Sequence, residues 1–238
     1  MLMYLPETPD TAPVKTSVST LVRDQSVGAL PEEEETVTEK RQTEEVIHTF
    51  RLDSSVTRPA FLDEEKASAV DIGSATHRCL RLLNLSLFRD EAASPYYRIR
   101  EEAERMEAEG TLSHEEARLI RYQGVSVFLE SDLGQRMLQS EEVHREWSFT
   151  MQLAPDHPTL VQGIVDCAFL EEGQWVLIDY KTDRDTAMDT FVPRHTLQMN
   201  WYRTALERLT HRPVREMWLY ALRAGIAYPV PRVRTAQY

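Results

Sequence analysis

Two apolar runs joined by a short Glu-Glu-Gly turn constrain the fold of this chain more than any other feature. Residues 160–170 and 175–181 are rich in Val, Ile, Leu, Phe and Trp, a pattern that predicts a β-hairpin. A loop of two or of four residues gives one register, in which Asp166 lies opposite Asp179, whereas a three-residue loop would break it. Because side chains alternate between faces, Lys181 then shares a face with both carboxylates.

Charges at these positions conflict with their surroundings. The charged face otherwise carries Ile164, Ala168, Leu170, Trp175 and Leu177, and the opposite face carries Val161, Val165, Phe169, Val176 and Ile178. Opposed like charges destabilise a sheet, and a sheet covered on both faces leaves little room for a solvated ion pair. The alternative is that Asp179 and Lys181 are a solvated pair on an edge strand, which is the commoner meaning of an isolated Asp-x-Lys tripeptide.

A divalent cation between two facing carboxylates would keep both of them ionised. A site with few hard oxygen ligands and open positions suits Mg²⁺. The metal would supply a hydroxide nucleophile, and Lys181 would orient the attacking water or neutralise charge on phosphorus. The hairpin therefore indicates phosphodiester hydrolysis.

Further motifs follow one another along the chain. They are Lys15-Thr-Ser-Val-Ser19, Gly73-Ser-Ala-Thr-His77, Arg145-Glu146-Trp-Ser-Phe149, Asp179-Tyr-Lys181-Thr-Asp183, Gln198 with Tyr202 four residues later, and Val214 to Tyr220. In this order and spacing they resemble the RecB-like branch of the PD-(D/E)XK nuclease superfamily, in particular the C-terminal nuclease domains of AddA helicase–nuclease proteins. The resemblance covers most of the chain.

The resemblance implies a role for each matched residue. The metal ligands would be His77, Asp166, Asp179 and the main-chain carbonyl of Tyr180, and the catalytic residues would be Asp166, Asp179, Lys181, Gln198 and Tyr202. Gln198 and Tyr202, on one helical face, would help to position Lys181 or the DNA backbone. Glu146 would be a supporting acid near the metal. A histidine ligand makes Mn²⁺ an alternative to Mg²⁺, because imidazole suits Mg²⁺ poorly.

Each of these residues also has a purely structural interpretation. His77 lies among leucines on an amphipathic segment, where a lone histidine is more often a core residue than a ligand. Gln198 and Tyr202 could simply pack a helix onto the sheet. Glu146 alternates with aromatic residues, as the solvent-facing side of a strand would.

The periodicities predict an α/β protein. Helices are expected near 71–90, 96–109, 114–139 and 190–210, and strands near 144–153, 160–170, 175–182 and 214–222. Ser113 and Glu116 have the spacing of a capping box at the start of the third helix. The α-β-β-β-α-β order predicts a mixed sheet flanked by helices, which the resemblance specifies as a restriction-endonuclease-like fold with an additional N-terminal helical region.

The chain is expected to contain one nuclease domain, residues 15–238, preceded by a linker over residues 1–14. Residues 24–58 are expected to form a polar, acidic insertion within it. The longest apolar runs fall short of the roughly 20 residues that a membrane span needs. The N-terminus also lacks the pattern of a signal peptide. We therefore expect a cytoplasmic protein without a membrane partner.

The cysteine content distinguishes two branches of the family that this chain resembles. Other RecB-like nucleases are expected to hold an iron–sulfur cluster, which needs several thiolates. Cys79 and Cys167 are too few to ligate one. We therefore expect no iron–sulfur cluster, and we expect both cysteines to be buried as small apolar residues.

The net charge of −12 is unusual for a protein that binds nucleic acid. Much of the acidic excess lies in Glu32 to Glu35, Glu44 with Glu45, and residues 101–109, whereas basic residues gather near the proposed site, namely Lys181, Arg184, Arg194, His195 and Arg203. A domain this acidic is expected to bind DNA poorly alone, which favours a larger assembly. The sequence has no Gly-x-x-x-x-Gly-Lys-Ser/Thr phosphate loop, so a helicase motor would lie on another polypeptide, lie outside this sequence, or not exist for this protein.

The leading hypothesis is a metal-dependent DNA nuclease that cuts single strands exonucleolytically, as part of an AddAB-like machine for double-strand-break repair. Its partners would be a single-stranded DNA end, a helicase motor and an AddB-like protein. One alternative is a catalytically silent module that binds DNA or docks a helicase partner. Another is a standalone exonuclease of a phage or mobile element. The complete set of His77, Asp166, Asp179 and Lys181 argues against a degenerate site.

Overall fold

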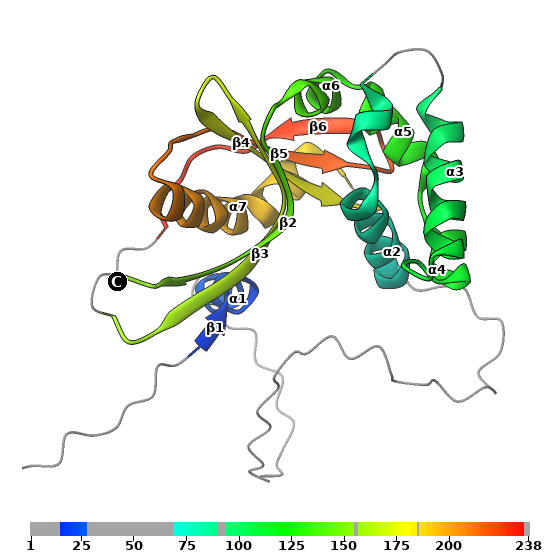
Figure 1. The fold of residues 1–238 in the computed structure, drawn as a ribbon. Coiled ribbons are helices and arrows are strands. Elements are labelled where there is room, and N and C mark those ends of the chain that lie inside the picture. The colour runs from blue at the N-terminus through cyan, green and yellow to red at the C-terminus, as the bar shows by residue number, and fades with distance from the viewer. Residues whose placement is uncertain (1–14, 28–68, 90–93, 155–156, 185, 236–238) are drawn as a thin grey trace, which may run out of the picture.

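The computed structural model describes residues 15–27, 69–89, 94–154, 157–184 and 186–235. Within these ranges, a mixed sheet of six strands separates a larger group of helices from a smaller one (Figure 1). The expected linker and residues 28–58 of the expected insertion lie outside the described ranges. Residues 24–27, where the expected insertion begins, form the end of a helix.

The strands of the sheet are β1 (Lys15–Ser17), β2 (Val143–Gln152), β3 (Leu160–Glu171), β4 (Gln174–Lys181), β5 (Val214–Ala221) and β6 (Ile226–Pro229). β4 pairs antiparallel with β3 and parallel with β5, and β6 pairs antiparallel with β5. β3 pairs along one edge with β2, whereas β1 and β4 share its other edge. The predicted mixed sheet is thus confirmed.

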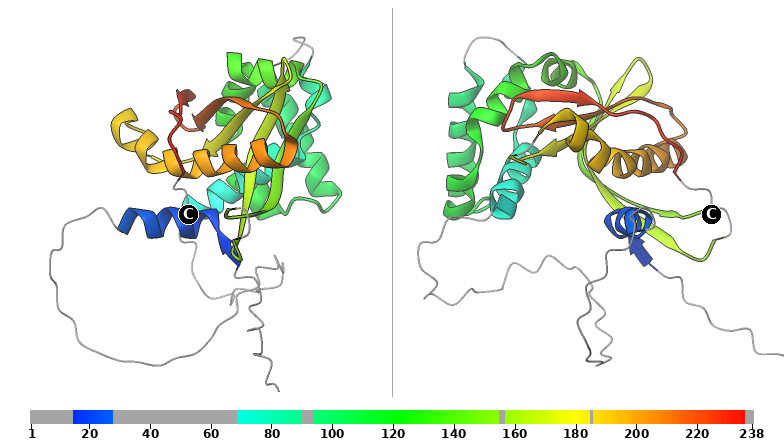
Figure 2. Two further views of the ribbon diagram at one scale, coloured as in Figure 1. Left: turned by 90° about the vertical axis from the view of Figure 1, so that its left-hand side faces the viewer. Right: turned by 180° about the vertical axis from the view of Figure 1, so that it is seen from behind.

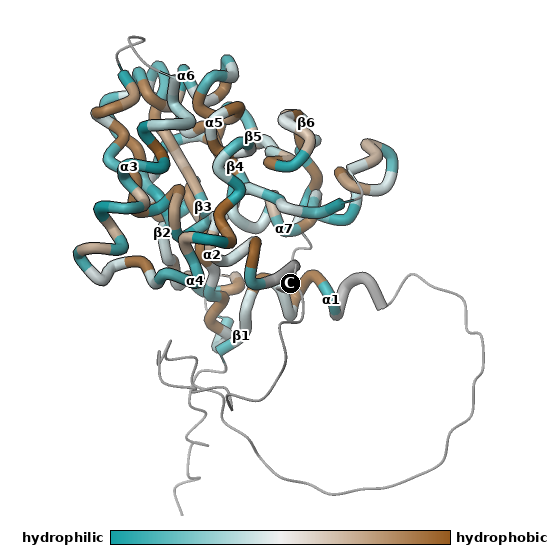
Figure 3. Tube along the Cα trace, turned by 90° about the vertical axis from the view of Figure 1, so that its right-hand side faces the viewer, coloured by the Kyte–Doolittle hydropathy of each residue, from teal (hydrophilic) through white to brown (hydrophobic). Residues whose placement is uncertain are grey.

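The helices are α1 (Val18–Val27), α2 (Ala69–Leu82), the 3-10 helix η1 (Leu85–Phe88), α3 (Pro95–Ala108), α4 (His114–Leu119), α5 (Tyr122–Glu130), α6 (Asp132–Gln139) and α7 (Met188–Thr210). Helices α2 to α6 cover one face of the sheet, and α1 and α7 cover the other (Figure 2). Each face has its own apolar core, and apolar stretches run along the strands between the two helix groups (Figure 3).

The predicted α-β-β-β-α-β order is confirmed by α2, β2, β3, β4, α7 and β5. The single helix expected over residues 114–139 is wrong, because three helices occupy that range. A new helix starts at α6 because the Oγ of Ser131 accepts the N–H of Gly134 at 3.2 Å, which caps it. The helix expected over residues 71–90 ends at Leu82. The capping box of Ser113 and Glu116 is confirmed.

The hairpin of β3 and β4 has the predicted register. Glu172 and Gly173 form its two-residue loop, with φ angles of 50° and 76° that fit a type I′ turn. Glu171 pairs with Gln174, and the ladder continues to Cys167 opposite Ile178. The positions of the two aspartates come directly after this last pair.

Pairing of β2 with β3 is interrupted at Glu146 and Asp166, although the residues on both sides of them are paired. Glu146 has a φ of 46°, in the left-handed region that non-glycine residues rarely adopt. Beyond this interruption, residues 147–152 and 160–165 form an extension of the sheet that we call the arm. On one face of the arm the side chains are exposed, and these are Ser148, Thr150, Gln152, Gln162 and Ile164.

The interruption also changes which face the side chains of β3 occupy. Val161 and Val165 pack in the same core as Ala168, next to α7. Strict alternation had placed the two valines on the opposite face, and that assignment is wrong. The cause is the interruption itself, because each strand passes through one unpaired residue and resumes with its faces exchanged.

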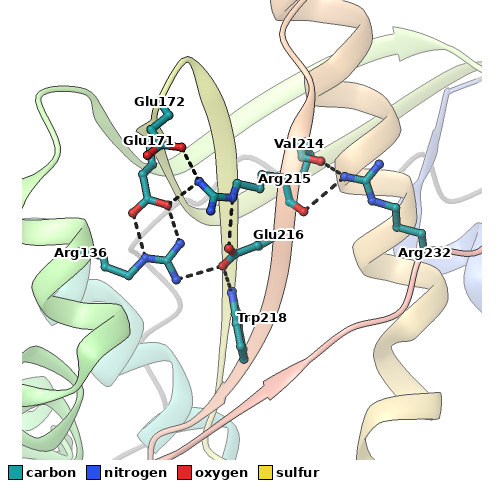
Figure 4. A network of polar contacts seen from close by, with 8 residues as sticks. All are labelled: Arg136, Glu171, Glu172, Val214, Arg215, Glu216, Trp218 and Arg232. Atoms are coloured by element: carbon teal, nitrogen blue, oxygen red, sulfur yellow. Dashed lines mark hydrogen bonds and ion pairs between the residues drawn. The ribbon is translucent and has the colours of Figure 1, made fainter.

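A polar network ties α6 to the far end of the hairpin (Figure 4). The guanidinium of Arg136 donates two hydrogen bonds to Glu171, at 2.9 and 2.7 Å, and one to Glu216 on β5, at 3.0 Å. Arg215 donates a hydrogen bond to Glu172 at 2.9 Å. The turn of the hairpin is therefore held to both neighbouring elements, which fixes the hairpin whose other end carries the site.

No helix in the described ranges has the length and apolar content that a membrane crossing requires. Cys79 and Cys167 are both buried and free, as predicted, and burial raises the pKa of each thiol to about 12.

Candidate active site

The predicted site residues meet where β3 and β4 stop pairing. Asp166 lies at the interruption on β3, and its Oδ2 accepts the backbone N–H of Tyr180 on β4 at 2.9 Å. The same Oδ2 lies 3.5 Å from Nδ1 of His77 on α2. Asp179 and Lys181 flank Tyr180 at the end of β4. Four side chains from three elements are thus collected around one strand end.

Asp179 and Lys181 form a buried ion pair. Lys181 Nζ lies 2.5 Å from Asp179 Oδ2, and the two side chains are only 17% and 4% exposed. The contact lacks hydrogen-bond geometry, so this buried oxygen has no directed donor among the described residues. Burial raises the pKa of Asp179 to about 6, Lys181 opposes this shift, and the charge of Asp166 adds to it.

Lys181 keeps its proton in this setting. Burial, the largest single effect, would lower the pKa of its ammonium, but Asp179, with Asp166 and Asp183, outweighs burial and raises the pKa above its ordinary value. At neutral pH the group is a fixed positive charge, so it can neutralise an anion but cannot serve as a base.

His77 is controlled by the two aspartates. Burial would lower the pKa of its imidazole, yet the contact with Asp166 and the charge of Asp179 outweigh burial and raise it. Gly73, one helical turn earlier, allows this approach. A Cβ at Gly73 would lie 3.1 Å from Oγ1 of Thr182, the residue after Lys181. A residue without a side chain thus lets α2 come close to the end of β4.

Helix α7 brings Gln198 and Tyr202 toward the site from the other face. Gln198 Nε2 donates to the hydroxyl of Tyr202 at 2.9 Å, so the two residues form one unit. Burial raises the pKa of Tyr202, and the charges of Asp179 and Asp166 raise it further. The phenol is therefore close enough for both carboxylates to raise its pKa, and it stays neutral at neutral pH.

Gly163 on β3 makes room for that tyrosine. The ring of Phe149 packs edge-on against Tyr202, with 5.9 Å between centroids. A Cβ at Gly163 would lie 2.6 Å from Cζ of Phe149 and 3.1 Å from Cε1 of Tyr202. The absence of a side chain at Gly163 therefore leaves room for the aromatic pair beside the site.

A cavity of about 770 Å³ opens beside the end of β4. Its walls come from α2, α4, the residue before α5, the interruption on β2, the end of β4 with the segment after it, and the turn after β5. The lining residues are Ile72, Gly73, Ser74, His77, Arg78, Arg81, Glu116, Arg121, Glu146, Tyr180, Lys181, Thr182, Asp183, Arg184 and Arg223. Glu146, predicted to be a supporting acid, lines this cavity and pairs with Arg81 at 2.8 Å.

Some of the predicted basic residues reach this cavity and others do not. Lys181 and Arg184 line it. Arg194 and Arg203 do not line it: Arg194 pairs with Asp183 of the cavity wall at 3.7 Å, and Arg203 pairs with Glu207 at 3.7 Å.

His195 is a neutral neighbour of the site. Its Nε2 is buried without a partner among the described residues, and its ring packs edge-on against Phe191. Burial, followed by the charge of Lys181, lowers the pKa of His195 to about 4.

Sequence reasoning missed four of the arginines that line the cavity, namely Arg78, Arg81, Arg121 and Arg223. They come from α2, from the residue before α5 and from the turn after β5. Their spacing in the sequence carries no signal of this proximity. Only Arg78 and Arg81 had such a signal, because they lie one and four residues after His77 and therefore on the helix predicted to carry it.

The donor set suits a divalent cation of the hard or intermediate class. Two carboxylates, an imidazole and a main-chain carbonyl are available from Asp166, Asp179, His77 and Tyr180. In the described part of the chain, no three acidic, histidine or cysteine side chains are already gathered as a metal cluster. The Oδ2 of Asp179 is buried and has no hydrogen-bond donor among the described residues, so its second contact beside Lys181 could be a cation.

Comparisons with known proteins show which family the chain is similar to. The family described as the PD-(D/E)XK nuclease superfamily matches residues 48–236. An ATP-dependent helicase/nuclease protein of Geobacillus kaustophilus (strain HTA426) is 31% identical over 194 residues, which cover 73% of this chain and 15% of that protein. Proteins of the same name from Bacillus pumilus (strain SAFR-032) and Clostridium botulinum (strain Loch Maree / Type A3) are 29% and 30% identical and cover 78% and 76% of this chain.

The chain spans only 15 to 17% of the length of these relatives. Among solved structures, the crystal structure of SSO0001 matches with a TM-score of 0.35 and 12% identity, over 70% of this chain and 78% of that one. That likeness is too slight to carry an argument.

Proposed function

The chain belongs to the PD-(D/E)XK nuclease superfamily, and on that basis we propose that it is a divalent-metal-dependent nuclease that hydrolyses phosphodiester bonds of DNA. The observation that carries the proposal is the buried ion pair of Asp179 and Lys181, next to Asp166 and His77 and beside a cavity rich in arginine. A buried ion pair has a high desolvation cost, and strongly perturbed titratable groups in a cavity are typical of a catalytic site.

The metal would be held by His77, Asp166, Asp179 and the carbonyl of Tyr180, and Mg²⁺ or Mn²⁺ both suit this donor set. When bound, it supplies activated water and neutralises charge on the phosphate. The hydrogen bond from Tyr180 N–H fixes the carboxylate of Asp166 in one orientation.

Lys181 would act on the phosphate as a fixed cation. Its raised pKa keeps it protonated, so it would stabilise the negative charge that grows on the phosphate oxygens in the transition state. A cation that is already in place and partly buried loses little energy in reorganisation when the charge develops.

Tyr202 would donate a hydrogen bond toward the site. Its oxygen already accepts from Gln198, so its own proton remains available. The raised pKa of Tyr202 means that the phenol keeps this proton. Tyr202 and Gln198 would therefore position a phosphate oxygen or an aspartate rather than transfer a proton.

We also propose the wider setting of this activity. The named relatives are helicase/nuclease proteins, and this chain matches only a small part of each. We propose that the domain degrades a single-stranded DNA end as an exonuclease, delivered by a helicase motor and assisted by an AddB-like second protein. The net charge of −12 supports this dependence, because it opposes unaided binding of DNA.

Digestion of labelled single-stranded DNA tests the activity. Wild type with Mg²⁺ or Mn²⁺ is compared with Asp179→Ala and Lys181→Ala, and with Glu142→Ala, which breaks an exposed ion pair to Arg212 far from the site. We expect cleavage by wild type and Glu142→Ala only, and none in EDTA. Equal cleavage by all four proteins would refute the site.

Linear and circular single-stranded substrates test whether the nuclease is an exonuclease. An exonuclease degrades linear single strands and leaves circular ones intact, so equal rates on the two would refute exonuclease action. Wild type that binds DNA but never cuts it, with either metal and with an AddB-like partner and helicase supplied, would indicate a silent module instead.

A further inference from the structure

Most charges on the wall of the cavity are balanced by a neighbour. Its acidic residues each pair with an arginine, as Glu116 with Arg78 at 3.6 Å, Glu146 with Arg81 at 2.8 Å and Asp183 with Arg194 at 3.7 Å. Lys181 pairs with Asp179. These pairings use up every carboxylate that lines the cavity.

Three guanidinium groups remain. The side chains of Arg121, Arg184 and Arg223 line the same cavity and make neither an ion pair nor a hydrogen bond within the described ranges. An arginine keeps its charge at every physiological pH, so the three groups repel one another. The chain has 39 acidic residues against 27 basic ones, which makes unpaired arginines in one cavity unexpected unless an anion occupies it.

Hydrogen bonds tie the backbone at Arg121 and next to Arg223 to the site, and Arg184 is close to it in sequence. Arg121 N–H donates to Thr76 Oγ1 at 3.1 Å, one residue before His77. Arg223 follows Leu222, whose N–H donates to the carbonyl of Lys181 at 2.9 Å. Arg184 lies three residues after Lys181. The three side chains therefore start from fixed points around the end of β4.

We propose that Arg121, Arg184 and Arg223 form a phosphate-binding subsite, which holds the DNA strand on one side of the bond that is cut. The inference rests on the proposed nuclease function. The planar guanidinium is suited to phosphate oxygens, because it offers several N–H donors in a fixed fork. The subsite contacts the backbone and not the bases, so it binds without regard to sequence.

The subsite explains how an acidic domain can hold a polyanion. Acidic residues elsewhere repel DNA, but the path beside Lys181 presents three uncompensated positive charges. Binding would therefore be strong only for a strand that enters the cavity, which favours a single strand threaded to the site.

The test compares two triple variants of the whole chain that lose the same charge. One is Arg121→Gln/Arg184→Gln/Arg223→Gln. The control is Arg23→Gln/Arg118→Gln/Arg234→Gln, at exposed arginines that do not line the cavity. Fluorescence anisotropy of a labelled oligodeoxythymidylate in EDTA gives the affinity at several salt concentrations, and thermal unfolding confirms that both variants fold.

We expect the subsite variant to bind about tenfold more weakly or worse, and to lose about two units of the slope of log affinity against log salt. The control should keep the wild-type slope. In cleavage assays the subsite variant should raise KM with kcat nearly unchanged, as for lost uniform binding. If the triple variant fails to fold, Arg184→Gln alone is expected to lose about 0.7 units of slope.

Equal affinities and slopes for the two triple variants would overturn the subsite, and so would wild type that does not bind the strand. If wild type cuts DNA while the two variants behave alike, the subsite fails and the nuclease function stands. If wild type never cuts DNA but its binding depends on the three arginines, the nuclease function fails and the subsite stands.

Discussion

Asp166 accepts a hydrogen bond of 2.9 Å from the backbone N–H of Tyr180 at the position where β3 and β4 stop pairing. A side-chain oxygen thus replaces the backbone carbonyl that a continued ladder would have supplied. The bond lets β3 diverge without leaving a buried N–H unpaired, and it points the carboxylate at the space between the two strands.

Two substitutions of Asp166 should separate its structural role, accepting the N–H of Tyr180, from its proposed catalytic role. Asp166→Asn keeps an oxygen acceptor for Tyr180 but loses the charge, so it should fold like wild type and lose cleavage by about a hundredfold or more. Asp166→Ala should also lose about 1–3 kcal/mol of unfolding free energy, because the N–H is left unpaired. Chemical denaturation and cleavage assays measure both. Equal stability of the two variants would contradict the structural task.

Loss of Lys181 should make the stability of the fold depend more strongly on pH. The pKa of Asp179 in the fold, about 6, lies above the ordinary 3.8, so its stabilising contribution is present below pH 3.8 and is lost as the pH rises through 6. Lys181→Met removes the partner that lowers this pKa, so the loss should extend to higher pH and reach about 3–5 kcal/mol.

The double variant Lys181→Met/Asp179→Asn is the control for that prediction. It has no buried charge at this pair, so urea unfolding at pH 8 should show most of the stability restored while cleavage stays absent. A double variant as unstable as Lys181→Met would show that the charge of Asp179 is not the cause.

A methyl group at Gly163 should disturb the aromatic pair next to the site. Gly163→Ala places a Cβ 2.6 Å from Phe149, so we expect the free energy of unfolding to fall by about 1–3 kcal/mol. Combination with Phe149→Leu should recover part of the loss, because the smaller side chain relieves the clash. Thermal unfolding of Gly163→Ala, Phe149→Leu and the double variant tests this. Equal melting temperatures for Gly163→Ala and wild type would contradict it.

His195 should destabilise the fold in mild acid. Its pKa in the fold, about 4, lies below the ordinary 6.5, so its contribution to stability is full above pH 6.5 and is lost as the pH falls through 4. His195→Phe cannot take up a proton and should lose less stability between pH 6.5 and pH 4 than wild type. Urea unfolding across this range measures the difference, and parallel pH profiles would count against the prediction.

Arg136 should stabilise the hairpin from its turn. Arg136→Gln removes three charged hydrogen bonds between side chains that are about one-third exposed. We therefore expect the free energy of unfolding to fall by about 2 kcal/mol, which is less than for a buried network. Arg136→Lys should restore less than half, because an ammonium cannot bond Glu171 through two parallel N–H groups. Arg212→Gln, at an exposed pair with Glu142, is the control and should stay within about 0.5 kcal/mol. An Arg136→Lys variant as stable as wild type would argue against the bidentate contact.

The hairpin register was predictable because a local pattern determines it. Two apolar runs and a turn at Glu172 and Gly173 leave few pairings, and loops of two and of four residues both place Asp166 opposite Asp179. The order of helices and strands and the capping box at Ser113 are local in the same way. The mixed sheet and its proposed site therefore followed from short segments.

The interruption of β2 and β3 was not predictable from such patterns. It depends on a left-handed backbone at Glu146, a residue type that gives no turn signal. It exchanged the faces of Val161 and Val165, which strict alternation had placed wrongly. The unpaired arginines were missed for a different reason, since Arg121 and Arg223 are about a hundred residues apart and only the tertiary fold joins them.

The arm beyond the interruption has one face against α1 and α7 and one face open. Substitutions at its open positions, such as Thr150, Gln162 and Ile164, change the surface next to the site without changing the packing of either core. In evolutionary terms, this surface can diverge among relatives while the ion pair at the strand end stays under a separate constraint.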